Sequence, residues 1–356
     1  MAARRAGRVA AGRLLTGAAA VAVAFAVAAL VVAALSRLRA RLPADTPNAR
    51  SLHAGAVPRG GGLAILAGFV PAALFTPPDV PGPWTVWIAC TGAVALVSFI
   101  DDVRSLPAAV RLLVQLASAG ALAWWMTIEQ SGIERIAATG ALALVIAWGA
   151  NLFNFMDGSD GLAGSMAVVG FAAYAIGAVS AGESGTAFAA LAVATLPFLF
   201  ANRPPASLFM GDVGAVPLGF LAAAFGIAGV VQGWWPAWFP ALVFLPFLGD
   251  ATLTLARRLV HGERVWQAHR THYYQRLNAL GAGHRGTLIA YGGAMLACAT
   301  VALACLGAAS HVGWIGLGLC AVLQLTAFTA IEYHSRRTTR SAAAGESGGR
   351  PGERER

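Results

Sequence analysis

Long apolar runs recur along this chain from near its N-terminus to about Ile331, and they constrain the fold more than any other feature. Each run has about 16 to 24 residues, enough, for some only marginally, to cross a hydrocarbon core of roughly 30 Å. About eleven runs begin near Leu14, Gly60, Trp84, Ala108, Ile136, Leu162, Gly185, Val213, Trp235, Thr287 and Val312. Only 12% of the residues are charged, against roughly 25% in soluble domains. The sequence therefore predicts an all-α integral membrane protein, a bundle of about ten to eleven transmembrane helices.

The two ends of the chain differ from this pattern. Residues 1–335 form the predicted polytopic domain, and residues 336–356, rich in Arg, Gly, Ser and Glu, are expected to be a disordered hydrophilic tail. The first apolar run follows Arg4, Arg5 and Arg8, as in a cleaved signal peptide. Its apolar core is longer than the roughly 7 to 15 residues of such signals, which favours a membrane span.

Basic residues predict the orientation of the helices. All 25 are arginine, and alternate connections carry very different numbers of them. The arginine-rich set comprises Arg37, Arg39, Arg41, Arg50, Arg59, Arg104, Arg111, Arg203 and the run from Arg257 to Arg285. The positive-inside rule assigns this set to the cytoplasm, although the arginines before the first run then lie outside.

The polar clusters that could do chemistry all fall in the same set of connections. They are SLHAGAVPRGGG (51–62), DDVRSLPAAVR (101–111), NLFNFMDGSDGLAG (151–164), FMGDVGAVPLG (209–219) and ERVWQAHRTHYYQRL (263–277). Chance would scatter such clusters over both faces. A membrane-embedded active site on the cytoplasmic face is therefore expected.

Five acids dominate these clusters, each at or near the end of an apolar run: Asp101, Asp102, Asp157, Asp160 and Asp212. Their mutual repulsion requires a counter-charge. Mg²⁺ is typically held by one or two carboxylates together with substrate phosphates, so a Mg²⁺-diphosphate substrate fits, with Mn²⁺ as a substitute. Glycines beside the acids let the backbone approach a ligand, and the arginines supply phosphate contacts.

Each feature also has a plainer explanation. A single Asp at the end of a span is more often a helix cap than a ligand, and glycines are common where membrane helices pack closely. Single arginines are most simply topology signals. The conjunction of five clusters on one face is what favours a site.

The motifs DDVRSL, NLFNFMDGSDGLAG and MGDVGAVPLG resemble the three signature loops of the polyprenyl-phosphate N-acetylhexosamine-1-phosphate transferases. This is glycosyltransferase family 4, and the chain is most similar to its O-antigen-initiating branch, related to the phospho-MurNAc-pentapeptide translocase. The resemblance implies transfer of a sugar 1-phosphate from a UDP-N-acetylhexosamine to undecaprenyl phosphate in the inner membrane, with release of UMP. It allows a homodimer and implies no nucleic-acid partner.

The resemblance also implies residue roles. Asp212 and Asn154 match the Mg²⁺ ligands, and Asp160 matches the contact to uracil. Asp157 lies where the family has an acid near the diphosphate, and Asp101 with Asp102 matches a paired acid whose role stays open between metal binding, deprotonation and positioning. The remaining expected substrate contacts are Asn151, Arg111, His269, Arg270 and His272.

One departure from the family concerns the last loop. Many members carry a His-x-His-His pattern, whereas here His272 is followed by Tyr273, Tyr274 and Gln275. We expect Tyr274 and Gln275 to influence the choice of sugar. Asp250, inside an apolar run, should face the bundle interior, and the sequence leaves open whether it is structural or part of the site.

Two other classes of function compete with this interpretation. An ion-coupled transporter would hold cations at intramembrane acids, but those acids should lie near the midplane. A catalytically silent scaffold for glycan assembly would not need the metal and nucleotide positions to be intact.

Overall fold

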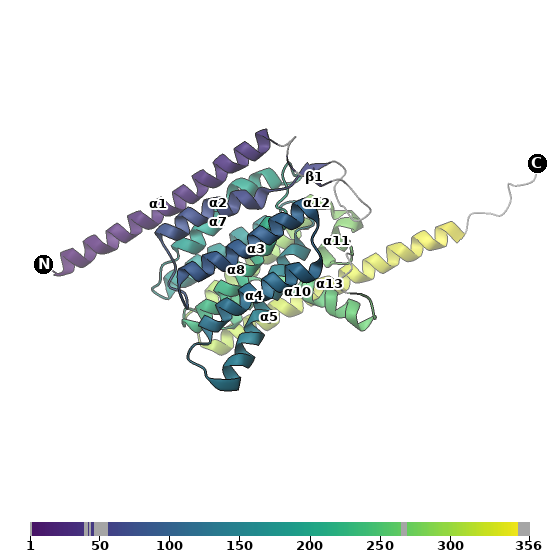
Figure 1. Ribbon diagram of the computed structural model, residues 1–356. Coiled ribbons are helices and arrows are strands. Elements are labelled where there is room, and N and C mark those ends of the chain that lie inside the picture. The colour runs from purple at the N-terminus through teal and green to yellow at the C-terminus, as the bar shows by residue number, and fades with distance from the viewer. Residues whose placement is uncertain (1, 39–41, 43, 46–55, 265–268, 348–356) are drawn as a thin grey trace, which may run out of the picture.

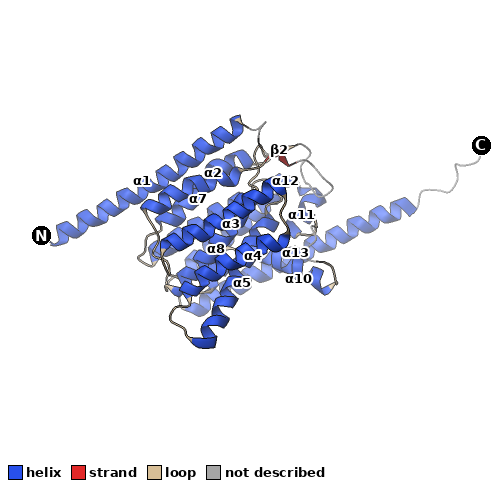
Figure 2. Ribbon diagram, viewed as in Figure 1, coloured by secondary structure: helices blue, strands red, loops and turns tan. Residues whose placement is uncertain are grey.

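The computed structural model describes residues 2–38, 42, 44–45, 56–264 and 269–347, and this part of the chain is almost entirely helical (Figures 1 and 2). The helices are α1 Ala2–Arg37, α2 Gly61–Phe75, α3 Trp84–Arg104, α4 Ala108–Met126, α5 Gly132–Met156, α6 Leu162–Ser180, α7 Thr186–Asn202, α8 Asp212–Val231, α9 Trp238–Val243, α10 Leu245–Val260, α11 Tyr273–Leu277, α12 Gly283–Cys305 and α13 Ser310–Ser347, with a π-helical turn η2 at Asn278–Ala282. Strands β1 Ala44–Asp45 and β2 Val57–Pro58 pair antiparallel.

The predicted membrane bundle is confirmed. Within the described residues, eight helices are long and apolar enough to span a bilayer, and two shorter apolar helices, α2 and α7, lie among them. Every predicted apolar run lies in a helix; α1 begins twelve residues before the expected Leu14, and the other helices begin within four residues of the expected starts. The run expected at Trp235 is divided into α9 and α10 at Phe244, and Pro246 in the first turn of α10 suits a new helix start.

Small residues let the helices on one side of the bundle approach closely. α1, α2 and α7 lie side by side in Figure 1, and their contact is made by alanines such as Ala24, Ala72 and Ala194. A Cβ on Gly68 would lie 2.4 Å from the backbone oxygen of Ala24, so only glycine fits there. In lipid, where burial against apolar tails gains little, such close packing is a main source of helix association.

The turn between α3 and α4 brings the first acid motif to the site. Ser105 ends α3 in the left-handed region (φ 47°) and donates its N–H to Asp101 O. Pro107 cannot continue the helix and precedes the first residue of α4. The chain therefore reverses within three residues, and Asp101 on α3 faces Arg111 on α4.

The expected disordered tail is wrong for residues 336–347. The structure continues α13 through this segment to Ser347, and the rest of the tail lies outside the described residues. Arg336 Nε donates to Glu332 Oε1 at 2.6 Å, a pair one turn apart that supports continuation of the helix. The alanines at 342–344 have the highest helix propensity of any residue.

Candidate active site

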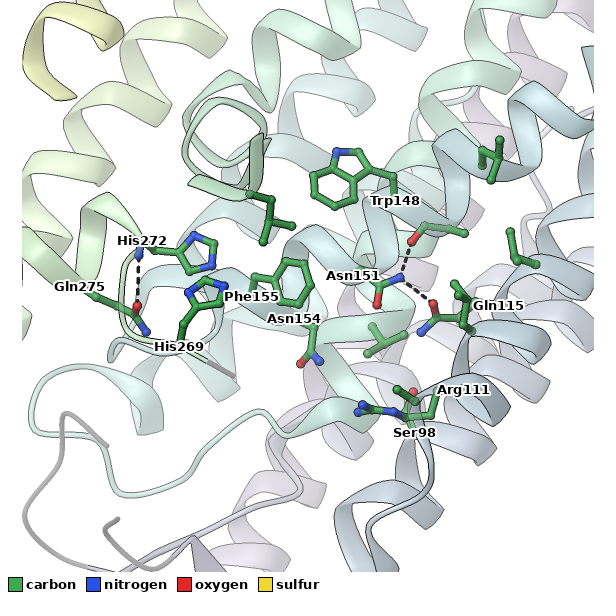
Figure 3. A pocket seen from close by; sticks show the side chains of 17 residues that line it. Ser98, Arg111, Gln115, Trp148, Asn151, Asn154, Phe155, His269, His272 and Gln275 are labelled. Atoms are coloured by element: carbon green, nitrogen blue, oxygen red, sulfur yellow. Dashed lines mark hydrogen bonds between the residues drawn. The ribbon is translucent and has the colours of Figure 1, made fainter. Parts of the chain in front are cut away.

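A cavity of about 740 Å³ opens where the ends of α3, α4, α5 and α8 meet the loop before α11 (Figure 3). One face of α5 lines it with Leu144, Ala147, Trp148, Asn151, Asn154 and Phe155, which recur every three or four residues as one side of a helix requires. The opposite lining includes Arg111, Gln115, His269, His272 and Gln275. Polar side chains gather at the helix ends, and Leu112, Leu116 and Leu144 are among the apolar lining residues.

Asp101, Arg111 and Asp212 form a connected charge group at the polar end. Arg111 Nη1 lies 2.5 Å from Asp101 Oδ2 and 3.3 Å from Asp212 Oδ2. Asp101 Oδ1 also accepts the backbone N–H of Leu106. Arg111 therefore bridges the end of α3 and the start of α8, with its guanidinium at the wall of the cavity.

Asp102 has a different environment from its neighbour. Its Oδ1 accepts the backbone N–H of Asp212 at 3.0 Å, and its Oδ2 accepts that of Val213 at 2.9 Å. These are free N–H groups at the first turn of α8, so Asp102 caps that helix from another part of the chain. Gly211 makes the contact possible, because a Cβ there would lie 2.8 Å from Asp102 Oδ2.

The VPRGGG segment holds the loop before Asp212. Phe209 N–H donates to Pro58 O, and the N–H groups of Gly61 and Gly62 donate to Phe209 O and Met210 O, all at 2.9 Å. A Cβ on Gly62 would lie 2.2 Å from Gly214 Cα. Glycines at both positions therefore allow α2 and α8 to touch through their backbones. Residues 51–55 of this predicted cluster lie outside the described residues.

The two asparagines of α5 point toward the cavity one turn apart. Asn151 Nδ2 donates to Gln115 Oε1 at 2.7 Å and to Ala147 O at 2.8 Å. Asn154 Nδ2 lies 3.5 Å from Asp212 Oδ2. The predicted metal pair, Asn154 and Asp212, is thus brought together from helices 58 positions apart in sequence.

Asp157, the residue at the C-terminal end of α5, lies within reach of three other acids. Burial raises its pKa well above the ordinary value, and the negative charges of Asp212 and Asp102 act in the same direction, opposed by Arg59. Repulsion of this kind identifies the place where a cation would be stabilised.

Asp160 lies outside the cavity lining. Its Oδ2 accepts the N–H of Ala206 at 3.0 Å, and its own N–H donates to His284 Nδ1 at 3.1 Å. Only 8% of the residue is exposed. Asp160 therefore joins the loop after α5 to the loop after α7 and the start of α12. The other four predicted acids do not line the cavity directly either, although Asp101 and Asp212 contact Arg111, which does.

The last loop delivers His269 and His272 to the cavity, with their rings stacked 4.9 Å apart (Figure 3). Burial, with smaller contributions from the charges of His272 and Arg258, lowers the pKa of His269 to about 4. His269 is therefore neutral near pH 7. Arg270 is exposed and does not line the cavity, and residues 265–268 of this predicted cluster lie outside the described residues.

Tyr274, which we expected to influence the choice of sugar, does not line the cavity. Tyr274 is 1% exposed, donates its hydroxyl to Phe155 O at 3.1 Å and is absent from the cavity lining. A Cβ on Gly158 would lie 2.1 Å from that hydroxyl, so Tyr274 packs under the loop after α5. Gln275 does line the cavity, and its Oε1 accepts the N–H of His272.

Sequence reasoning missed Gln115 and Trp148, which also line the cavity. Gln115 could have been found, since it lies four residues after Arg111 within an apolar run and thus on the same side of α4. Trp148 carries no polar signal that distinguishes it from the other apolar residues of α5.

A metal ion would need ligands from outside the protein. Among the described residues, no group of three or more His, Cys, Asp or Glu side chains is arranged to hold a metal by itself. The oxygens of Asp212 and Asn154 are nevertheless hard donors of the kind that bind Mg²⁺ together with substrate phosphates. A half-turn of the Asn154 amide presents its oxygen in place of its nitrogen, a change that heavy-atom positions do not distinguish.

Comparison with known proteins finds transferases of similar sequence. The probable undecaprenyl-phosphate N-acetylglucosaminyl 1-phosphate transferase of Bacillus subtilis (strain 168) is 29% identical over 266 residues, covering 69% of this chain and 72% of that protein. The undecaprenyl-phosphate alpha-N-acetylglucosaminyl 1-phosphate transferase of Escherichia coli O157:H7 is 26% identical over 330 residues, covering 84% and 85%. The decaprenyl-phosphate N-acetylglucosaminephosphotransferase of Mycobacterium tuberculosis (strain CDC 1551 / Oshkosh) is 27% identical over 289 residues, covering 68% and 70%.

The model of one protein family matches part of the chain. It matches residues 84–230, the segment that runs from the start of α3 almost to the end of α8 and supplies Asp101, Asp102, Asn154, Asp157 and Asp212. With its acids gathered at one end of the bundle, the chain is similar to glycosyl transferase family 4 across residues 84–230 and to these transferases over about two thirds of its length or more.

Proposed function

We propose that this chain transfers an N-acetylhexosamine 1-phosphate from a UDP-sugar to undecaprenyl phosphate, or a similar polyprenyl phosphate. An oxygen of the lipid phosphate attacks the phosphorus that carries the sugar. The bond between the two phosphoryl groups of the donor breaks, and UMP leaves with the bridging oxygen. The product is a lipid diphosphate that carries one sugar. The names of the relatives, which act on undecaprenyl or decaprenyl phosphate, support this chemistry.

The observation that carries the proposal is the contact of Asp212 with Arg111 and Asn154, both of which line the cavity. Both substrates are phosphate anions, so their approach requires positive charge. The Arg111 guanidinium supplies a planar pair of donors for phosphate oxygens. It already lies against two carboxylates, which hold it in place before a substrate enters.

A Mg²⁺ ion bound with the diphosphate would supply the remaining charge and stabilise the charge that develops on the leaving UMP. Asp212 and Asn154 are the residues that would hold it, and Asp157 is near enough to add a further oxygen or an electrostatic contribution. The acids that repel one another around Asp157 support a cation at this point.

The paired acids need not remove a proton. A phosphate monoester has its second pKa at about 6 and is largely dianionic at neutral pH. In the structure Asp101 is paired with Arg111, and both oxygens of Asp102 accept backbone N–H groups of α8. We therefore assign both acids to positioning, Asp101 of the arginine and Asp102 of the helix that carries Asp212.

The cavity suits an acceptor that is polar at one end only. From Asn154 to Leu144 the lining of α5 changes from polar to apolar over ten residues, about 15 Å along a helix. A second cavity of about 360 Å³ adjoins it at Trp148 and is lined almost wholly by apolar side chains of α5, α8 and α10, with Leu142, Phe153, Ala222 and Leu248 among them. We place the prenyl chain along these apolar walls and its phosphate near Arg111.

The transporter alternative is not favoured. The acids lie at the ends of α3, α5 and α8, and none of the five is near the middle of a span. We place this end of the bundle in the cytoplasm of a bacterial cell, where UDP-sugars are available, because the arginine-rich connections are at the same end.

The test is turnover by purified protein in detergent micelles with undecaprenyl phosphate. UDP-N-acetylglucosamine, UDP-N-acetylgalactosamine and UDP-N-acetylfucosamine are offered in parallel, and UMP and the lipid product are measured with Mg²⁺ and with excess EDTA. The proposal expects UMP and sugar-diphospholipid in equal amounts from at least one donor, only when both the lipid phosphate and a divalent cation are present. UMP release without the lipid, or undiminished turnover in EDTA, would contradict it.

A further inference from the structure

Asp250 is a buried carboxylate that the proposed reaction does not yet use. It lies on α10, with none of its surface exposed. A charged side chain within a membrane segment is costly unless neighbouring groups compensate it. Its surroundings therefore decide what it does.

Five donors surround this carboxylate. Oδ1 accepts from Thr254 Oγ1 at 3.2 Å, Tyr273 N at 3.0 Å and His272 Nδ1 at 3.2 Å. Oδ2 accepts from Tyr274 N at 2.9 Å and Tyr291 Oη at 2.5 Å. Each oxygen thus receives one backbone N–H, so both act as acceptors.

His272 differs from the other donors because it alone lines the cavity. Its ring is held against Phe155, with centroids 6.0 Å apart, and against His269 (Figure 3). With a carboxylate oxygen at Nδ1, that nitrogen must carry a proton, since an unprotonated Nδ1 would face the carboxylate with two lone pairs opposed. Nε2, on the other side of the ring, is then left for a group in the cavity.

His272 also lies at the start of a helix. It is the N-cap residue of α11, a place where Ser, Thr, Asp or Asn usually accepts the free N–H groups of the first turn. Here Asp250, 23 and 24 positions earlier in the chain, accepts the N–H groups of Tyr273 and Tyr274. Asp250 thus satisfies the first two free N–H groups of α11, while the His272 side chain faces the N–H of Gln275 in a capping box.

We infer that Asp250 is a positioning residue for the reaction, which holds His272 by Nδ1 so that Nε2 is presented to a phosphate oxygen in the cavity. This inference rests on the proposed function. When Nε2 also carries a proton, its N–H can donate to a phosphate oxygen of the donor or of the leaving UMP.

The competing explanation is that Asp250 only caps α11 and stabilises the fold. A double-mutant cycle on kcat separates the two. Asp250→Asn, His272→Gln and the double variant are compared with the parent protein, with the melting temperature of each measured in the same detergent. Tyr291→Phe, alone and with His272→Gln, is the matched control, because it removes a donor from the same carboxylate and leaves the His272 contact in place.

The inference expects Asp250→Asn to lower kcat on the order of 10- to 100-fold in the parent, as loss of an orienting partner of a functional histidine does. With Gln at position 272 the same change should cost no more than about twofold, the limit of additivity for uncoupled sites. Tyr291→Phe should lower the melting temperature and have the same effect on kcat in both backgrounds.

Equal losses from Asp250→Asn in both backgrounds, or no loss in either, would overturn the inference. If Asp250→Asn does not fold, Asp250→Glu takes its place in the cycle, since it keeps the acceptor charge and displaces it by one methylene. Failure of the proposed function and failure of this inference give different results. If the parent protein shows no turnover, the proposed function is contradicted. If it turns over but the effects of the Asp250 and His272 substitutions on kcat are independent, only the role of Asp250 is contradicted.

Discussion

The carboxylate of Asp102 accepts the backbone N–H of Asp212 at 3.0 Å, so the end of α3 fixes the start of α8 across 110 positions of sequence. Two neighbouring acids thus have separate partners, Asp101 the arginine of α4 and Asp102 a helix terminus. The two acids form one motif in the sequence, but each fixes a different part of the structure. Their substitutions should have different consequences.

Asp102→Ala should destabilise the fold more than Asp101→Ala does. It leaves the N–H groups of Asp212 and Val213 without acceptors in a largely buried place, at a cost of about 1 to 3 kcal/mol for each unsatisfied group. Thermal unfolding in detergent, followed by tryptophan fluorescence, measures the difference, with Asp79→Ala on an exposed loop as the control. Equal melting temperatures for the Asp101 and Asp102 variants would contradict the capping role.

Asp212→Asn should lower kcat/KM on the order of 100-fold or more while the protein stays folded. The change keeps the size of the side chain and removes the charge that would stabilise a cation and hold Arg111. UMP release over a Mg²⁺ titration is the measurement, and Asp79→Asn is the control for loss of one acid at the other end of the bundle. Turnover by Asp212→Asn at the parental rate would rule out its role as a ligand.

Gly158→Ala should impair activity, and Tyr274→Phe should partly restore it. A Cβ at position 158 would lie 2.1 Å from the Tyr274 hydroxyl and 3.2 Å from the ring carbon that bears it. Removing the hydroxyl relieves the closer contact and leaves the other tight. Gly140→Ala, where no atom lies within 4 Å of the new Cβ, should be close to neutral. Rescue is read from kcat of the double variant, and a double variant no better than Gly158→Ala would show that the clash is not the cause.

His269 should make the fold sensitive to acid between about pH 6.5 and 4. The unfolded chain takes up a proton near the ordinary histidine pKa of 6.5, whereas burial delays protonation of the folded form to about 4. Falling pH therefore favours the unfolded state through this window. The melting temperature of the parent should fall more steeply than that of His269→Gln as pH is lowered from 6.5 to 4. Parallel curves for the two proteins would contradict this expectation.

The orientation is tested with cysteines introduced at Arg264 and Asp79, both exposed and at opposite ends of the bundle. The native residues Cys90, Cys298, Cys305 and Cys320 are replaced first. An impermeant thiol reagent on intact cells should label position 79 and spare position 264, and both should react after lysis. The reverse pattern would invert the topology.

Most of the fold was predictable because each segment that spans a bilayer must be apolar over a sufficient length. The starts of α3, α4 and α6 coincide with the predicted starts, since each follows a loop with polar, Gly or Pro residues. The break at Phe244 was not predicted, because Pro246 in an apolar run fits either a kinked helix or a new one. The helical end of α13 was missed because its composition is polar, although polar composition does not prevent a helix.

The contacts between side chains limited how much of the site could be predicted from the sequence. The motifs indicated Asp101, Arg111, Asn154 and Asp212, and the structure brings these four together. Sequence spacing could not show that Tyr274 faces inward, because α11 is only five residues long and presents no clear periodicity. It could not show the donors of Asp250 either, since Tyr291 lies on another helix 41 positions away.

The hydrogen bond from Tyr291 to Asp250 also concerns the order in which the nascent chain becomes active. Every acid of the charge group has been synthesised by residue 212, and His272 follows 60 positions later. The carboxylate that orients His272, however, lacks one of its buried donors until α12 has entered the membrane. A ribosome-bound chain that ends before Tyr291 thus contains all of the proposed ligands, while the buried Asp250 still lacks its hydroxyl donor from α12. Assembly of α12 therefore completes the hydrogen bonding of this carboxylate only after every residue of the charge group is in place.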